Sequence, residues 1–256
     1  MGRRSCGNRR RPAAPRQVTE SRVAMSHVPT VLVPGLLCSP RLYAEQLPPL
    51  WRFGPVSVAS IHHDDSIAAI ARRFLAAAPP QFALAGLSMG GYLAFEIMRQ
   101  AGHRVTRLAL LNTSARPDTA EQAQSRRDQI AMTQDGQFAE VVEILYRRWV
   151  RAARRSDLAL HRVIRQMAGE TGPEAFIRQQ TAIMNRPDSR TGLAAIGCPA
   201  LVVAGADDDV ATPDRAVEIA GQIPRARLVV VPDCGHLSAL EQPAAVTQAL
   251  VSWLTQ

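Results

Sequence analysis

Short apolar runs alternate along the chain with longer segments whose apolar residues recur every three or four positions. The short runs predict six strands, at Thr30–Val33, Pro55–Ile61, Phe82–Ala85, Val105–Leu111, Ala200–Ala204 and Arg227–Val231. The longer segments predict helices over residues 66–78, 89–100, 213–223 and 239–254. Strands that alternate with helices in this way are typical of a parallel sheet. The sequence therefore predicts an α/β fold, with a mainly parallel sheet of about six strands and helices on both faces.

The alternation stops between Asn112 and Cys198, where no strand-like run occurs. Four helices are predicted in this stretch, over residues 119–133, 137–155, 157–168 and 173–184. A helical insertion between two strands of a sheet is typical of a lid or cap. The sequence thus predicts one domain over residues 28–256, with a helical cap inserted at about 115–190.

Charge separates the beginning of the chain from the rest. The 256 residues carry a net charge of +8, and every one of the 30 basic residues is arginine. Residues 1–24 alone carry +6, which leaves +2 for residues 25–256. This first stretch offers almost no apolar run and no secretory signal, so residues 1–27 are predicted to be a disordered basic tail. Met25 is a candidate natural start, and residues 1–24 are expected to be dispensable. A transit peptide or a nucleic-acid arm is the alternative for this tail, and no nucleic-acid partner is predicted.

The remaining composition narrows the class of protein. A hydrophobic fraction of 46% is ordinary for a globular chain and excludes disordered, collagen-like and coiled-coil classes. The four cysteines, Cys6, Cys38, Cys198 and Cys234, show neither CxxC spacing nor the density of a disulfide scaffold, which predicts a reducing, cytoplasmic location. No apolar stretch approaches the roughly 20 residues that span a bilayer, so no membrane partner is predicted.

A candidate nucleophile lies between a predicted strand and a predicted helix. The sequence there is Gly86-Leu87-Ser88-Met89-Gly90, which has the pattern G-x-S-x-G. A sharp strand-to-helix turn of this kind holds a serine in a strained conformation with its hydroxyl exposed. Glycine suits the positions two residues away on either side because larger side chains would collide across the turn. Backbone N–H groups at the start of the helix favour developing negative charge.

A serine nucleophile needs a base, and His236 is the candidate among six histidines. It alone follows a buried strand near the end of the chain, and loops at the carboxyl ends of parallel strands are where such sheets build their sites. Ser238 and Glu241 have the spacing of a capping box, which predicts that a helix begins directly after the loop.

The acid that would orient His236 is expected after the strand at 200–204, where Asp207, Asp208 and Asp209 are adjacent. A metal site is an alternative use of three carboxylates, but further ligands are not close in the sequence. The residues themselves leave open which aspartate faces the histidine.

The order of serine, aspartate and histidine, with the G-x-S-x-G turn and the helical insertion, resembles the α/β-hydrolase fold superfamily. The likeness is greatest to its small capped esterase and enol-lactonase-like branch, and it covers roughly residues 28–256. It is strong over Gly86–Tyr92 and over Leu228–Pro243, and moderate over Val31–Cys38. The family usually begins with an antiparallel pair of strands, for which residues 1–28 offer no pattern.

The resemblance implies roles for individual residues. It assigns Asp208 as the acid, with Asp209 as the alternative because Pro213 follows Asp209 by four residues. It also implies an oxyanion hole formed by the backbone N–H groups of Leu36 and Met89. This sequence has Pro34-Gly35 where the family more often has His-Gly, a change that leaves a backbone donor possible.

The activity implied is that of a serine hydrolase, an enzyme that cleaves a small ester, lactone or thioester through a Ser-His-Asp triad and an acyl-enzyme. A small-molecule substrate is expected, and no metal or organic cofactor. The same triad also serves C–C bond hydrolases, perhydrolases and acyltransferases, and a non-catalytic ligand-binding protein is a further alternative. No oligomeric state and no particular substrate are predicted.

Two other groups of residues suggest further chemistry. The segment His62-His63-Asp64-Asp65 resembles a metal cluster, but Asp64, Asp65 or Ser66 would also serve as a helix cap. Arg147, Arg151 and Arg154 fall on one face of the predicted helix 137–155, opposite an apolar stripe. Such a face is most often solvated, and binding of an anionic substrate is the alternative.

Overall fold

A computed structural model describes residues 1–2 and 28–255, so the predictions for residues 3–27 lie outside the described part of the chain. Six strands form one sheet in the order β2-β1-β3-β4-β5-β6, and every neighbouring pair is parallel. The strands are β1 (Thr30–Val33), β2 (Val56–Val58), β3 (Phe82–Leu87), β4 (Val105–Leu111), β5 (Ala200–Gly205) and β6 (Ala226–Val231). The predicted parallel α/β sheet of six strands is confirmed.

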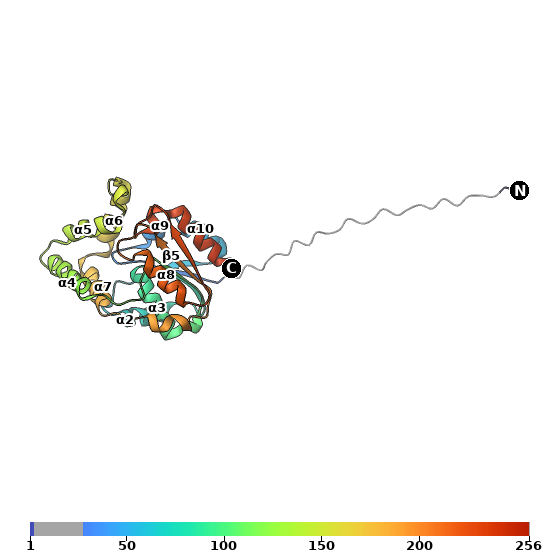
Figure 1. Cartoon of the computed structure of the whole chain (residues 1–256), viewed down its shortest axis with the longest axis horizontal. Coiled ribbons are helices and arrows are strands. Elements are labelled where there is room, and N and C mark those ends of the chain that lie inside the picture. Colours follow the sequence, from blue (N-terminus) through green and yellow to red (C-terminus); the bar gives the residue numbers. More distant parts are fainter. Residues whose placement is uncertain (3–27, 256) are drawn as a thin grey trace.

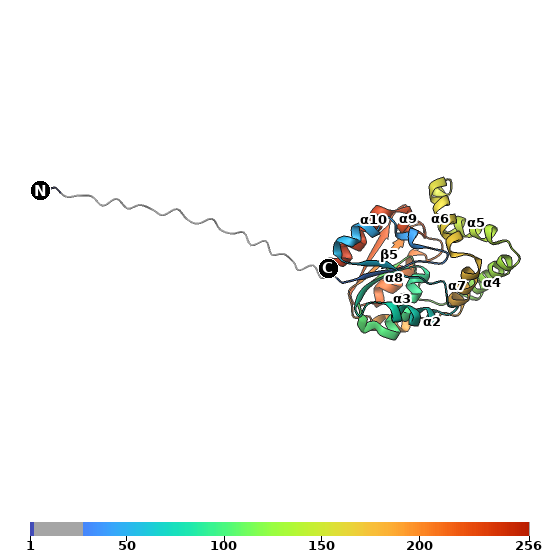
Figure 2. The same ribbon diagram turned by 180° about the vertical axis from the view of Figure 1, so that it is seen from behind.

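The central strands are apolar on both faces, as burial between two helical layers requires. Every residue of β1, β3 and β5 is buried, whereas the edge strands β2 and β6 are mostly half-buried or exposed. Figures 1 and 2 show helices on both sides of the sheet, with α2, α3 and α8 together on one side and α10 on the other. These helices span Ile67–Ala77 (α2), Met89–Ala101 (α3), Pro213–Gln222 (α8) and Pro243–Leu254 (α10).

The helix expected over 239–254 is divided into α9 (Ser238–Glu241) and α10. Pro243 is the first residue of α10, where its missing N–H and fixed φ are tolerated, and it ends α9. The expected capping box at Ser238 and Glu241 is wrong. The N-cap of α9 is Leu237, whose apolar side chain cannot accept a hydrogen bond, and Ser238 is already the first residue of the helix. The carboxylate of Glu241 accepts a hydrogen bond from the N–H of Arg151.

Four helices follow one another between β4 and β5, and together they are called the helical insertion. They are α4 (Ala120–Gln134), α5 (Phe138–Trp149), α6 (Leu158–Thr171) and α7 (Pro173–Met184). Figure 1 shows them side by side beyond one end of the sheet. The expected helix 137–155 ends early, at Trp149, because Val150 is extended and a separate turn follows. A capping box is present at the start of α4, between Thr119 and Gln122.

The remaining regular segments are short. They are α1 (Leu47–Leu50) and 3₁₀ turns at Pro40–Tyr43, Trp51–Phe53, Gly102–Arg104, Ala152–Arg154 and Arg190–Ala195. Within residues 1–2 and 28–255, no helix has the length and apolar character needed to cross a bilayer.

Candidate functional site

Ser88 occupies the sharp turn between β3 and α3, where its backbone has a φ of 56° and a ψ of −111°. The glycines of the motif are required by close backbone contacts. A Cβ added to Gly86 would lie 2.2 Å from the carbonyl oxygen of Gly90, and one added to Gly90 would lie 2.3 Å from that of Val33. No real Cβ is found so close to another atom, so the turn can form only with glycine at both positions.

The structure brings Ser88, His236 and Asp208 into one hydrogen-bonded chain, although they are far apart in the sequence. The Oγ of Ser88 lies 2.8 Å from Nε2 of His236, and Nδ1 of His236 lies 2.9 Å from Oδ2 of Asp208. His236 and Asp208 are each only 2% exposed. A buried carboxylate on one ring nitrogen favours the tautomer whose other nitrogen can accept a proton from the serine.

Asp208 is held as a carboxylate by several donors. Burial alone would raise its pKa, but the neighbouring His236, the Asn112 amide and the N–H of Ala211 together hold the pKa of Asp208 below its ordinary value. The amide Nδ2 of Asn112 donates to Oδ2 over 2.9 Å, and the N–H groups of Val210 and Ala211 donate to Oδ1.

The two aspartates beside Asp208 point elsewhere. Asp207 pairs with Arg151 over 3.0 Å, and Asp209 is exposed. Within residues 28–255, no group of three or more His, Cys, Asp or Glu side chains is placed to hold a metal ion.

Asn112 is a site residue that the sequence analysis missed. It follows β4 directly and has a positive φ of 46°, and its amide also donates to the carbonyl of Gly235. A signal was available in the sequence, because Asn112 follows a buried strand and so lies at the same carboxyl end of the sheet as Ser88 and Asp208.

The segment after β1 passes next to Ser88. A Cβ added to Gly35 would lie 3.5 Å from the Cβ of Ser88. Leu36 lines the same cavity as Ser88, and Met89 is the first residue of α3, where an N–H has no acceptor within the helix. Both residues suggested by the resemblance as backbone donors therefore lie beside the serine.

A second residue missed by the sequence analysis, Gln179 of α7, supports this segment. The N–H of Leu37, which has a φ of 56°, donates to Oε1 of Gln179 over 3.1 Å. Gln179 is fully buried, and its amide also approaches the carbonyl of Ile61 at 3.4 Å. Nothing in the sequence near Gln179 indicated this contact.

A cavity of about 140 Å³ opens over Ser88, between the end of the sheet and the helical insertion. Ser88 and His236 line it together with Gly35, Leu36 and residues of α4 and α5. Cys38 also lines the cavity, but burial raises the pKa of its thiol to about 12, so the thiol stays protonated and unreactive.

The other motifs singled out in the sequence serve local structure. Ser66 is the N-cap of α2, and Asp64 pairs with Arg73. Arg151 and Arg154 lie beyond the end of α5. Arg151 forms ion pairs with Asp207 and Asp233, and Arg154 forms one with Asp157. The predicted single helical face of Arg147, Arg151 and Arg154 is therefore wrong, because the helix ends before two of the three.

Comparison with known proteins places the chain in a family. The model of the alpha/beta hydrolase family matches residues 26–249. The chain belongs to the alpha/beta hydrolase family. A thermophilic esterase from Thermogutta terrifontis has a TM-score of 0.80 and 30% sequence identity, over 89% of each chain. An enol-lactonase from Burkholderia xenovorans LB400 has a TM-score of 0.82 and 25% identity, over 90% of this chain and 92% of its own.

A curated relative has a different name. A protein from Mycobacterium tuberculosis, provisionally named as the non-heme bromoperoxidase BpoC, is 28% identical over 177 residues. That alignment covers 66% of this alpha/beta hydrolase and 66% of the relative, just under two thirds of its length. Members of the family with similar structures therefore carry names that differ in the reaction.

Proposed function

We propose that this alpha/beta hydrolase is a serine hydrolase that cleaves a small ester, lactone or thioester through an acyl-enzyme. The observation that carries the proposal is the hydrogen-bonded chain from Ser88 Oγ through His236 to Asp208, with contacts of 2.8 and 2.9 Å. A serine, a base and a buried acid in this arrangement are what nucleophilic acyl transfer requires.

His236 is proposed to take the proton of Ser88 as the serine attacks the substrate carbonyl. Asp208 keeps the ring in the required tautomer and stabilises its charged form. His236 then gives the proton to the leaving alcohol or thiol, which leaves an acyl group on Ser88. Water attacks this ester with His236 again as the base, and the acid product and free Ser88 result. None of these steps calls for a metal or an organic cofactor.

The N–H groups of Leu36 and Met89 are proposed to bind the oxyanion that forms in each attack. Their place beside Ser88 supports this role, and removal of one such donor typically costs about 3–4 kcal/mol of transition-state stabilisation. The buried Gln179 positions the segment that carries Leu36, through its hydrogen bond with Leu37.

Covalent labelling with a fluorophosphonate tests the proposal directly. The wild type should be labelled, and Ser88→Ala should abolish labelling and lower kcat on p-nitrophenyl esters and lactones by about 10⁴-fold or more. Ser114→Ala is the matched control, because Ser114 lines the same cavity and should leave labelling intact.

Other outcomes distinguish the alternatives. A folded wild type that is neither labelled nor active on any ester or lactone would contradict the proposal and favour a ligand-binding protein. Labelling without ester or lactone hydrolysis would favour C–C bond hydrolysis, perhydrolysis or acyl transfer.

A further inference from the structure

Arginine dominates the charge around the cavity over Ser88. Five arginines line it, whereas Asp118 is the one carboxylate among its lining residues in the described part of the chain. The arginines are Arg116, Arg126, Arg148, Arg186 and Arg215. Guanidinium groups stay charged at any ordinary pH, so the charge of the cavity depends on how many of them meet a carboxylate.

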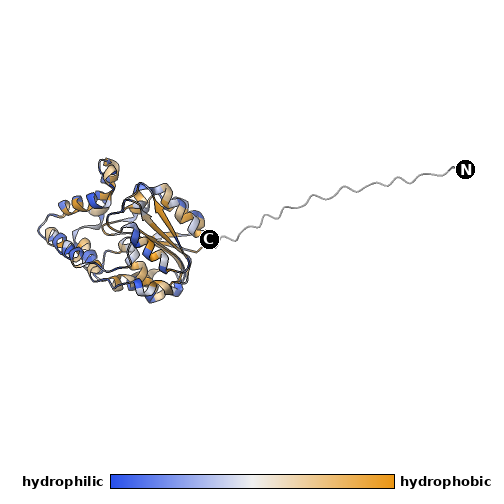
Figure 3. Cartoon of the chain, viewed as in Figure 1, coloured by the Kyte–Doolittle hydropathy of each residue, from blue (hydrophilic) through white to orange (hydrophobic). Residues whose placement is uncertain are grey.

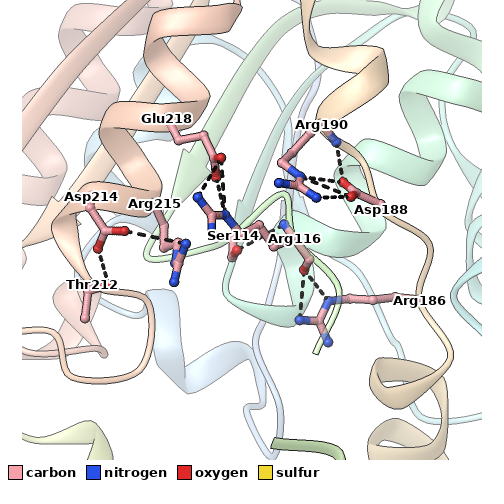
Figure 4. Close-up of polar contacts among 9 residues, drawn as sticks. All are labelled: Ser114, Arg116, Arg186, Asp188, Arg190, Thr212, Asp214, Arg215 and Glu218. Carbon is pink, nitrogen blue, oxygen red and sulfur yellow. Dashed lines mark hydrogen bonds and ion pairs between the residues drawn. The ribbon is translucent and has the colours of Figure 1, made fainter. Parts of the chain in front are cut away.

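Three of the five arginines are paired within the protein. Asp118, whose side chain is 2% exposed, accepts hydrogen bonds from both Arg126 and Arg186 over 2.7 Å. Arg116 makes a two-pronged ion pair with Glu218, at 2.9 Å for each of its two shortest contacts. Figure 4 shows Arg116 turned toward Glu218, and the guanidinium of Arg186 against the backbone carbonyl of Arg116. These three guanidinium groups form part of the cavity wall, and each already contacts a carboxylate of the protein.

The other two arginines keep most of their donors free. Arg215 has one ion pair, a long contact of 3.5 Å with Asp214, and that carboxylate also accepts a hydrogen bond from Thr212 (Figure 4). The side chain of Arg148 has no hydrogen bond or ion pair with any residue between 28 and 255. Arg148 comes from α5 and Arg215 from α8, so two separate elements place an arginine with free donors at one cavity.

The cavity wall formed by α4 is polar as well. The side chains that α4 contributes, besides Arg126, are those of Gln122, Ser125 and Gln129. Figure 3 shows α4 as largely hydrophilic, whereas the strands behind Ser88 are hydrophobic. A volume of about 140 Å³ is close to that of engineered cavities of about 150 Å³ that hold benzene. The space thus suits a compact polar molecule better than a long acyl chain.

We propose that the substrate of this hydrolase is a compact ester, lactone or thioester that carries a carboxylate, and that Arg148 and Arg215 bind this carboxylate while Ser88 attacks the carbonyl. The inference rests on the proposed function and adds its substrate class. A carboxylate presents two oxygens in the geometry that a guanidinium fork binds in pairs, and it supplies the charge that the cavity lacks.

Two pairs of substrates that differ in one charge test this inference. In one pair the charge is on the acyl side: mono-p-nitrophenyl adipate and its methyl ester. In the other it is on the alcohol side: 4-acetoxybenzoate and its methyl ester. Background hydrolysis is subtracted from every rate. We expect the wild type to prefer the charged member of at least one pair in kcat/KM by about 10-fold, as a charge-assisted hydrogen bond implies.

Substitution locates the binding groups. Arg148→Gln and Arg215→Gln should each lower kcat/KM for the charged ester about 10-fold more than kcat/KM for its methyl ester, mainly through KM. Arg147→Gln is the matched control. It removes the same charge from the neighbouring position of α5. Arg147 is exposed, as Arg148 is, but it does not line the cavity, so the preference should remain.

Each possible outcome is informative. Equal or faster hydrolysis of the uncharged member in both pairs would overturn the inference and leave the proposed function standing. An equal loss of preference in Arg147→Gln would also overturn the inference. The overall positive field of the protein, rather than contacts of Arg148 and Arg215, would then explain the preference for a charged substrate. Absence of both hydrolysis and fluorophosphonate labelling would overturn the proposed function and this inference with it. Protection of Ser88 from labelling by adipate gives a readout that does not depend on turnover.

Discussion

The carboxyl end of the sheet and the helical insertion both face the cavity, but different forces hold their functional groups. At the sheet, buried strands and backbone contacts fix Ser88, where the Cβ of any residue other than glycine at position 86 would lie 2.2 Å from a carbonyl oxygen. On the side of the helical insertion, residues around the cavity are held by side-chain hydrogen bonds and ion pairs, such as those of Asp118 and Gln179. The position of Ser88 is thus fixed by the backbone, and we expect selectivity to be set by side chains that can change without loss of the fold.

The two regions are joined at the end of α5. Arg151 pairs with Asp207 over 3.0 Å and with Asp233 over 2.8 Å, and these residues lie in the loops that carry Asp208 and His236. The N–H of His236 donates to the carbonyl of Trp149 over 2.8 Å. The helical insertion therefore supports the positions of Asp208 and His236, besides covering them.

The largest contrast is expected between two glycines, one in each region. Gly86→Ala should destabilise the protein by about 4 kcal/mol or more, because the collision is with backbone that cannot move without disrupting the turn. Gly169→Ala, on the exposed side of α6, has no atom within 4 Å of the added Cβ and should stabilise by about 0.5–1 kcal/mol. Denaturant unfolding of both variants measures the difference, and similar values for the two would contradict the comparison.

A smaller effect, with a pH dependence, is expected at Asn112. Asn112→Ala should lower the free energy of unfolding by about 2 kcal/mol at pH 7, because the carboxylate of Asp208 loses a buried donor. The lowered pKa of Asp208 means that its contribution to stability is complete above the unfolded value of about 3.9 and is lost as the pH falls through the lower folded value.

The deficit of Asn112→Ala should therefore shrink below about pH 4, toward the roughly 1 kcal/mol of a hydrogen bond between neutral groups. Denaturant titrations between pH 7 and pH 3 measure this. Asn185→Ala is the control, since Asn185 is exposed and its amide donates only to a carbonyl of its own helix. A deficit at Asn112 that is independent of pH would show that the amide serves Gly235 rather than the charge of Asp208.

The contrast between the two regions also explains which features of the fold and of the site could be predicted from the sequence. The sheet and the G-x-S-x-G turn were predictable because burial and backbone collision leave a periodic pattern and specific glycines in the sequence. Gln179 and Asp118 left no such signal, since Gln179 binds Leu37 and Asp118 binds Arg186, and both partners are far away in the chain. The prediction of a capping box at Ser238 is wrong for a similar reason. The carboxylate of Glu241 accepts a hydrogen bond from the N–H of Arg151, which is far away in the chain. For anion binding the sequence pattern indicates Arg147, Arg151 and Arg154, whereas the arginine of α5 that lines the cavity is their neighbour Arg148.

The smallest of these effects is expected at Gln179, where the helical insertion supports the segment of Leu36 and Leu37. Gln179→Leu removes the acceptor of the Leu37 N–H, so this segment should relax away from Ser88. We expect kcat to fall about 10-fold, which is about 1.4 kcal/mol in the barrier, with little change in KM, because an oxyanion donor acts on the transition state. Steady-state kinetics on p-nitrophenyl acetate measure both constants.

Gln180→Leu separates positioning of this segment from general loss of stability. Gln180 is the next residue of α7 and is equally buried, but its amide bonds only within the helical insertion, with Arg126 and Gln129. Both variants should lose similar stability, while kcat on an uncharged ester should fall chiefly in Gln179→Leu. Equal losses of kcat would mean that the insertion acts as one packed unit, and that no single side chain transmits its support to the segment beside Ser88.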